Sequence, residues 1–235
     1  MTEEFKSSEL TQDEKWSQDL DKVTDLLWKD RPKESVDVLY FFGRSFFDAH
    51  KGGLYKIAVE LYKQKIVKKI IIPGTEGERL DEATPRVAHP GKTLMKNRLV
   101  KMGIDEDDVV FSEPGYHTKA EGDAFLRYSV EHNLHRAVVL TNPHQITRAM
   151  LGLIKTIDDN SLPVDVYAVT PNPSKFDWQR RVKGSQGMER KKAFEHIQDE
   201  IDRIKLYQNK GDLATFDEAL SYMVRRDMTK GSRVA

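Results

Sequence analysis

Apolar residues along the chain follow two patterns, short continuous runs and stripes that recur every three or four positions. The runs cover residues 36–42, 69–72, 109–111, 137–140 and 164–169, are continuous except for Asp37, Lys69 and Asp165, and each stops at a glycine, a proline or a polar residue. Such runs are typical of strands that are buried on both faces. The stripes cover residues 54–66, 94–103, 118–132 and 146–154, which predicts amphipathic helices between the strands.

Strands that alternate with helices in this way pair in parallel and are joined by right-handed crossovers. We therefore expect an α/β fold, a Rossmann-like three-layer α/β/α sandwich with a mostly parallel five-stranded sheet. The length of 235 residues suits one sizeable α/β domain with added arms.

Helical stripes also lie outside the alternating region. Residues 16–27 predict an amphipathic helix, and residues 188–207 and 216–223 predict two more. We divide the chain into an N-terminal helix (1–35), a Rossmann-like domain (36–173) and a C-terminal helical extension packed on that domain (174–235). The basic run at 190–192 falls on a polar helix face in this interpretation, and the aperiodic stretch 75–90 is expected to be a long loop, with the role of a lid left open.

Composition excludes several classes of function. Lys+Arg and Asp+Glu both number 38, so no overall charge attracts a nucleic acid or an anionic membrane. Cysteine is absent, which excludes disulfides and thiolate metal sites, and the histidines show no metal-ligand spacing. No apolar run has the length of a membrane span and no signal peptide is visible. We expect a cytoplasmic protein with no metal, nucleic-acid or membrane partner.

Ligands of open parallel sheets bind beyond the carboxyl ends of the strands. This rule selects the loops after the first four strands. The candidate ligand-binding residues there are Gly43, Arg44, Ser45, Gly74, Thr75, Glu113, His117, Thr118, Thr141, Asn142 and Arg148. The chain has neither a G-x-G-x-x-G fingerprint nor a P-loop, and its glycines are equally compatible with simple turns.

Two of these segments also have a purely structural interpretation. Thr118-x-x-Glu121 matches a capping box, which is our first interpretation of that segment, and Asn142 before Pro143 matches a helix N-cap. In the functional alternative, Glu113, His117 and Glu121 share the crevice and bind or transfer protons.

His144 and Arg148 are four residues apart, so they share one face at the start of a helix. A histidine and an arginine beside a helix N-terminus suit an anionic ligand. Glu121 and His144 are the candidate catalytic residues, as base and acid.

The order of three motifs is similar to that of a known family. Ile-Ile-Ile-Pro-Gly ends at Gly74, His-Thr-x-x-Glu covers 117–121, and Thr-Asn-Pro-His-x-x-x-Arg-Ala covers 141–149. Over residues 36–169 this order resembles the ElyC/SanA/YdcF family of small α/β proteins. The resemblance implies a Rossmann-like fold, a ligand crevice at the strand ends and S-adenosylmethionine as a ligand of soluble members.

Our leading hypothesis is a soluble, YdcF-like protein that binds an anionic, nucleotide-like small molecule, with S-adenosylmethionine as the candidate. Two alternatives stay open. One is a transferase or phosphoester hydrolase that uses His144 and Glu121, and the other is a non-enzymatic interaction module that uses the C-terminal helices.

Overall fold

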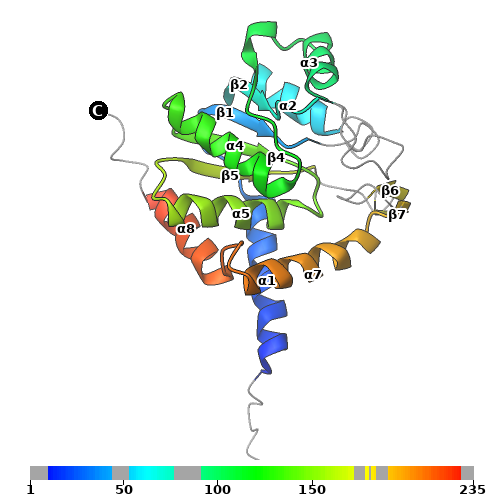
Figure 1. Ribbon diagram of the computed structural model, residues 1–235, viewed down its shortest axis with the longest axis vertical. Coiled ribbons are helices and arrows are strands. Elements are labelled where there is room, and N and C mark those ends of the chain that lie inside the picture. The colour runs from blue at the N-terminus through cyan, green and yellow to red at the C-terminus, as the bar shows by residue number, and fades with distance from the viewer. Residues whose placement is uncertain are drawn as a thin grey trace, which may run out of the picture.

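The computed structural model describes residues 10–43, 53–76, 91–171, 178–179, 181–183 and 190–228. One sheet contains five strands in the order β3-β2-β1-β4-β5, and all of its strand pairs are parallel (Figure 1). The strands are β1 (Val36–Phe41), β2 (Val67–Ile72), β3 (Val109–Phe111), β4 (Arg136–Leu140) and β5 (Asp165–Val169). The expected Rossmann-like α/β fold is confirmed.

Helices cover both faces of this sheet. On one face lie α2 (Gly53–Lys63) and α3 (Lys92–Lys101), and on the other lie α4 (Thr118–Glu131) and α5 (Ile146–Asp159). Side chains of β1 alternate between the two cores, because Val38 and Tyr40 join the α4–α5 side while Leu39 and Phe41 join the α2–α3 side. Burial on both faces explains why the strands are continuous apolar runs.

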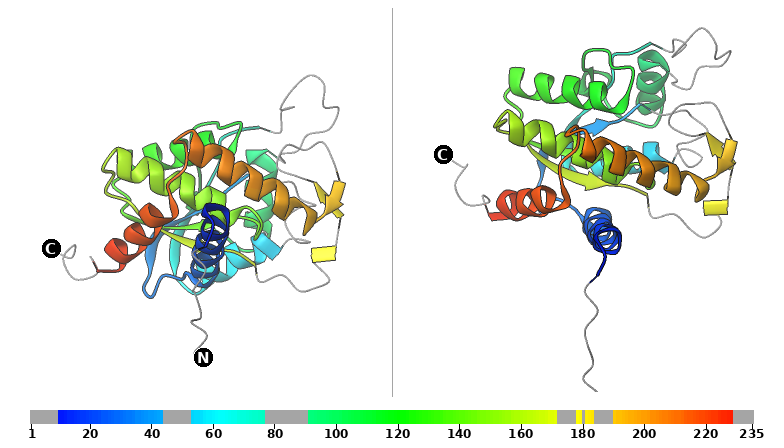
Figure 2. Two further views of the ribbon diagram at one scale, coloured as in Figure 1. Left: turned by 90° about the horizontal axis from the view of Figure 1, so that it is seen from below. Right: turned by 60° about the horizontal axis from the view of Figure 1, so that its bottom comes forward.

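The helices near the two ends of the described chain gather on the α5 side of the molecule (Figure 2). They are α1 (Gln12–Lys29), α7 (Glu195–Asn209) and α8 (Phe216–Met228). Leu20 and Leu27 of α1 are buried in the same core as Phe216 of α8, and the Trp16 indole donates a hydrogen bond to Gln208 at 3.0 Å. The segments before β1 and after β5 therefore share a hydrophobic core with the sheet.

The predicted helix over residues 188–207 is wrong in its first part. The helix α7 begins only at Glu195, and before it β6 (Arg181–Lys183) and β7 (Arg190–Lys192) form an antiparallel pair. The basic run at 190–192 is therefore a strand and not a polar helix face. The physical reason is that residues 189–193 contain a single apolar residue, Ala193, so nothing in that stretch continues the helical stripe.

Two further predictions concern the loop over residues 75–90 and the absence of a membrane-spanning helix. Of the predicted long loop over 75–90, residues 77–90 lie outside the described residues. Among the helices that are described, none combines the length and the apolar character that crossing a lipid bilayer requires.

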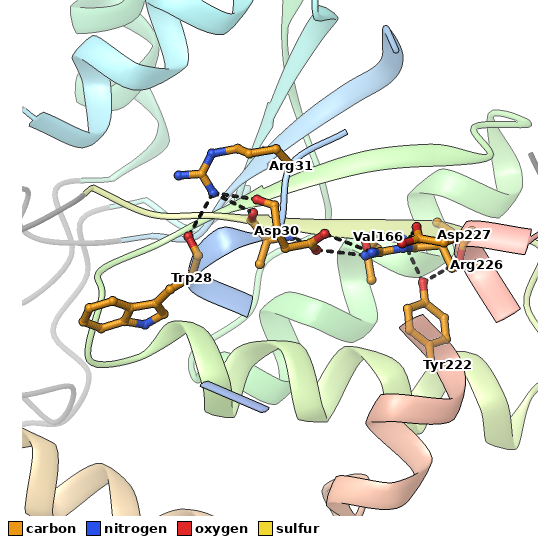
Figure 3. A network of polar contacts seen from close by, with 9 residues as sticks. Trp28, Asp30, Arg31, Val166, Tyr222, Arg226 and Asp227 are labelled. Carbon is orange, nitrogen blue, oxygen red and sulfur yellow. Dashed lines mark hydrogen bonds and ion pairs between the residues drawn. The ribbon is translucent and has the colours of Figure 1, made fainter. Parts of the chain in front are cut away.

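The strand β5 lies at one end of the sheet, and side chains cover its edge that faces away from β4 (Figure 3). The Tyr222 hydroxyl accepts a hydrogen bond from the Val166 N–H at 2.8 Å, and Arg226 donates to the Val166 carbonyl at 2.7 Å. Two residues further along, the Ala168 N–H donates to the Asp30 carboxylate at 2.8 Å. The backbone groups that point away from β4 are thus paired with side chains.

The same cover contains a buried ion pair. The Arg226 guanidinium donates to both carboxylate oxygens of Asp30, at 2.8 and 2.9 Å, and the two side chains are only 2% and 7% exposed. Burial by itself would lower the pKa of Arg226. The hydrogen bond to Asp30 and the charge of Asp30 raise that pKa by more than burial lowers it, so the pKa lies above the ordinary value. Because Asp30 follows α1 and Arg226 lies on α8, the pair joins both terminal helices to β5.

Candidate functional site

The sheet order reverses between β1 and β4, which places their carboxyl ends side by side. Phe41 is in register with Leu140, and the next residue, Phe42, donates its N–H to the Leu140 carbonyl at 3.2 Å. Gly43 follows β1 and Thr141 follows β4, and both residues are buried. In parallel sheets this switch point is where ligands bind. Arg44 and Ser45, also candidates, lie outside the described residues.

A buried carboxylate lies beside Gly43, just after the end of β1. Glu121, in the first turn of α4, is 4% exposed, and its Oε2 accepts a hydrogen bond from the Gly43 N–H at 3.3 Å. The Glu121 backbone carbonyl accepts a second bond from the Tyr40 hydroxyl at 2.9 Å. These contacts attach the start of α4 to the end of β1 and place an acidic group at the switch point.

The predicted capping box at Thr118 and Glu121 is wrong. The N-cap of α4 is His117, whose Nδ1 accepts a hydrogen bond from the Ala120 N–H at 3.2 Å. The helix therefore begins one residue earlier than a cap at Thr118 requires. Glu121 is then the fourth helical residue, one position beyond the third, from which a glutamate side chain accepts a hydrogen bond from the N-cap backbone N–H. The carboxylate turns to Gly43 instead.

The predicted N-cap at Asn142 is also wrong. The helix α5 begins at Ile146 with Gln145 as its N-cap, and residues 143–145 form a turn. In that turn the Asn142 carbonyl accepts from the N–H groups of Gln145 and Ile146, at 3.0 and 3.1 Å. The Asn142 side chain is consequently not used to cap α5.

Three polar side-chain atoms of this loop are buried without a partner. Thr141, Asn142 and Gln145 are 0%, 1% and 1% exposed, and in the described part of the chain Oγ1, Oδ1 and Oε1 respectively have no hydrogen-bond partner. Leaving one such group unpaired costs about 1–3 kcal/mol. Since buried polar groups are nearly always paired, three unpaired oxygen atoms in one loop are unusual.

The loops after β2 and β3 are bound to each other. The Thr75 hydroxyl donates to the Gly115 carbonyl at 2.9 Å and accepts from the Gly115 N–H at 3.0 Å. A Cβ added to Gly74 would lie 2.2 Å from the Ser112 carbonyl oxygen. The glycine at 74 is thus explained by contact with the protein's own backbone, and the Thr75 hydroxyl is engaged in the same contact.

The structure does not bring Glu113, His117 and Glu121 together. Glu113 is exposed and accepts from Arg127 of α4 at 2.6 Å. His117 is exposed at the helix start, and Thr118 beside it is half-buried, while Glu121 alone is buried against Gly43. Of the three titratable candidates, Glu121 is therefore the one at the switch point.

The helix α7 adds charged groups that the sequence did not predict. Arg148, near the start of α5, donates from Nε and Nη2 to the Glu200 carboxylate at 2.5 and 3.3 Å, and their side chains are 10% and 4% exposed. The rings of His144 and His196 lie 5.9 Å apart between centroids. His196 and Glu200 lie four residues apart on α7, whereas Arg148 lies on α5 and His144 lies in the turn before that helix. The predicted shared helix face of His144 and Arg148 is therefore wrong, because α5 begins only at Ile146.

Burial alone would raise the pKa of Glu200. The charge and hydrogen bond of Arg148 and the charges of His144 and Arg203 outweigh burial, so this pKa lies below its ordinary value of 4.5. A lowered folded-state pKa means that Glu200 stabilises the fold above its ordinary pKa. This contribution is lost as the pH falls through the folded-state pKa.

The described residues contain no group of three or more histidine, aspartate or glutamate side chains that could hold a metal ion. Comparison with known proteins adds no assignment: neither a protein-family model nor a curated protein matches the chain.

Proposed function

We propose that the chain binds a nucleotide-like small molecule, with S-adenosylmethionine as the first candidate, at the carboxyl edge of the sheet between β1 and β4. One observation carries the proposal. Three buried and unpaired side-chain atoms of Thr141, Asn142 and Gln145 lie in the loop that begins at this switch point. The resemblance to the ElyC/SanA/YdcF family supports the same edge and the same class of ligand.

The chemistry of the surrounding groups supports this ligand class. A hydroxyl and two amides can orient a base or a sugar by hydrogen bonds, as the few polar groups of small-molecule sites do. Glu121, held by the Gly43 N–H, adds a carboxylate of the kind that accepts bonds from ribose hydroxyls.

Thr141→Val tests the proposal because valine keeps the shape of threonine and removes the unpaired hydroxyl. We expect the Kd for the ligand to rise about tenfold. We also expect the free energy of unfolding without ligand to stay within about 0.5 kcal/mol or to increase, since no protein hydrogen bond is lost. Native mass spectrometry and calorimetric titration with S-adenosylmethionine, its demethylated product and adenosine measure the Kd. Urea unfolding measures the free energy of unfolding.

Thr147→Val is the matched control. This buried threonine of α5 is 5% exposed, and its hydroxyl bonds the Thr24 hydroxyl of α1 at 3.0 Å. The control is expected to lose about 1 kcal/mol of stability and to keep its affinity. If Thr141→Val is destabilised like the control and no nucleotide-like compound binds the wild type, the proposal is wrong.

A second candidate function is supported by the burial of Glu121 at the same edge. A carboxylate in that place suits a general base of a transferase or a phosphoester hydrolase, with His144 as its acid partner. Glu121→Gln keeps an oxygen acceptor for the Gly43 N–H and removes the base. An enzyme would lose about 100-fold or more in kcat with the ligand Kd within about threefold, as single-turnover and binding assays would show. If Glu121→Gln loses ligand binding and the wild type shows no measurable turnover, the enzymatic function is wrong and the binding function stands.

A further inference from the structure

Arg31 lies between α1 and β1 in the chain and beside the carboxyl end of β5 in space. Its Nη1 donates to the Ala168 carbonyl at 3.3 Å, and its Nη2 donates to the Thr170 carbonyl at 3.4 Å. The Thr170 hydroxyl donates in turn to the Thr141 carbonyl at 3.0 Å. Since neighbouring strands are about 4.8 Å apart, the guanidinium lies within about 10 Å of the end of β4. Arg31 therefore belongs to the same edge of the sheet as the loop with the three unpaired oxygen atoms.

One pair of donors on the Arg31 guanidinium is open. The carbonyls of Trp28, Asp30 and Ala168 all accept from Nη1. Among the described residues, Nη2 donates only to the Thr170 carbonyl, at the long distance of 3.4 Å, and Nε donates to no atom. Two parallel N–H groups of this kind form the fork with which an arginine binds both oxygens of a carboxylate or a phosphate.

The same pair of donors is occupied in two other arginines. Arg148 donates from Nε and Nη2 to Glu200, and Arg127 donates from the same two atoms to Glu113. A carboxylate of the protein thus fills the fork in both cases. No carboxylate in the described part of the chain accepts a hydrogen bond from Arg31.

The charge of Arg31 is only partly balanced. The adjacent Asp30 directs its carboxylate to Arg226 and to the Ala168 N–H, and Figure 3 shows Arg31 and Arg226 on opposite sides of Asp30. Removal from water lowers the pKa of Arg31, and the charge of Asp30 offsets only part of that shift, so the pKa lies below its ordinary value. A guanidinium in this state gains from an anion that binds its fork.

We infer that Arg31 binds the anionic group of the ligand through Nε and Nη2, while the loop after β4 binds the uncharged part. The carboxylate of S-adenosylmethionine and the phosphate of a nucleotide both offer the pair of oxygen atoms that this fork takes. The inference rests on the proposed function. It adds a binding residue that lies before β1, outside the residues that resemble the ElyC/SanA/YdcF family.

Calorimetric titration of the full chain with three compounds tests the role of Arg31. Adenosine has no anionic group, the demethylated product of S-adenosylmethionine has a carboxylate, and adenosine monophosphate has a phosphate. The wild type is expected to bind one of the two anionic compounds at least about tenfold more tightly than adenosine. Arg31→Gln is expected to lose at least about tenfold in affinity for that compound, with the Kd of adenosine within about threefold. The compound that loses affinity identifies the group that Arg31 binds.

Two further variants separate the fork from the charge. Arg31→Lys keeps the charge and removes the paired donors, so its affinity for the anionic compound is expected to lie between those of the wild type and Arg31→Gln. Arg225→Gln removes the same charge from α8, where Arg225 donates to Asp158 in the last turn of α5, which precedes the amino end of β5. This control is expected to change none of the three Kd values. Circular dichroism spectra confirm that each variant is folded, and Arg31→Lys carries the comparison if Arg31→Gln does not fold.

Each result decides between the two proposals. If Arg31→Gln weakens all three compounds equally, or weakens none, Arg31 does not bind the anionic group and the inference is wrong. The proposed function then stands as long as Thr141→Val raises the Kd of adenosine. If the wild type binds neither these compounds nor S-adenosylmethionine, both proposals are wrong.

Discussion

An Arg226→Ala variant is expected to lose about 3–5 kcal/mol of unfolding free energy, the range for a buried ion pair that loses one partner. The change leaves the Asp30 carboxylate buried without its bidentate donor and leaves the Val166 carbonyl without its side-chain partner. It also removes a guanidinium that lies 4.1 Å from the centre of the Tyr167 ring. Urea unfolding followed by circular dichroism measures the loss.

The neighbouring arginine is a matched control on the same helix. Arg225 donates to Asp158 at 2.5 Å, but its side chain is 58% exposed. Arg225→Ala is therefore expected to change stability by about 0–1 kcal/mol. A double variant, Arg226→Met/Asp30→Asn, removes both buried charges and should be more stable than Arg226→Ala. Equal losses for the two alanine variants would mean that the buried pair does not hold α8 on β5.

Gly74→Ala is expected to destabilise the fold by about 3 kcal/mol, at the upper end of the cost of overpacking. The added Cβ would lie 2.2 Å from the Ser112 carbonyl oxygen, which is backbone and cannot move aside as a flexible side chain would. The loops after β2 and β3 would have to separate, although the Thr75 hydroxyl holds them together through Gly115. Thermal and urea unfolding measure the effect.

Gly152→Ala provides the opposite expectation at another glycine. A Cβ there would lie 3.4 Å from one Leu213 side-chain atom, an ordinary contact, and the residue is inside α5. Alanine favours a helix by about 1 kcal/mol over glycine, so this variant is expected to be unchanged or more stable. If both variants lose the same stability, crowding at Ser112 is not the reason that residue 74 is glycine.

The five strands could be predicted because most of their residues are buried between the helices on the two faces of the sheet. A strand such as β1, with alternate residues in two cores, has no polar face, so a continuous apolar run marks it directly. The position of the switch point was not predicted: the sequence selected the loops after four strands, and the pairing of β1 with β4 came from the structure.

The details of the site could not be predicted, because they depend on partners far apart in the chain. The Glu121 carboxylate does not cap α4 and instead accepts a hydrogen bond from Gly43, which is 78 residues away in the chain. Arg148 pairs with Glu200, which is 52 residues away. On α7 the buried positions include His196 and Glu200, while Phe194 and Ile197 are 41% and 37% exposed. Hydrophobic periodicity shows which residues are apolar, and it cannot show a polar pair that is buried by mutual contact.

The cover on β5 also has a consequence for the order of events during synthesis. Val166 of β5 and Arg226 are 60 residues apart, so the ribosome releases β5 well before it releases the arginine that covers the strand. Until α8 emerges, the outward N–H of Val166 lacks the Tyr222 hydroxyl as its partner. An open strand edge is a template for pairing with another chain. A nascent chain that stalls before α8 is therefore the species most exposed to self-association, and the arrival of α8 ends that exposure.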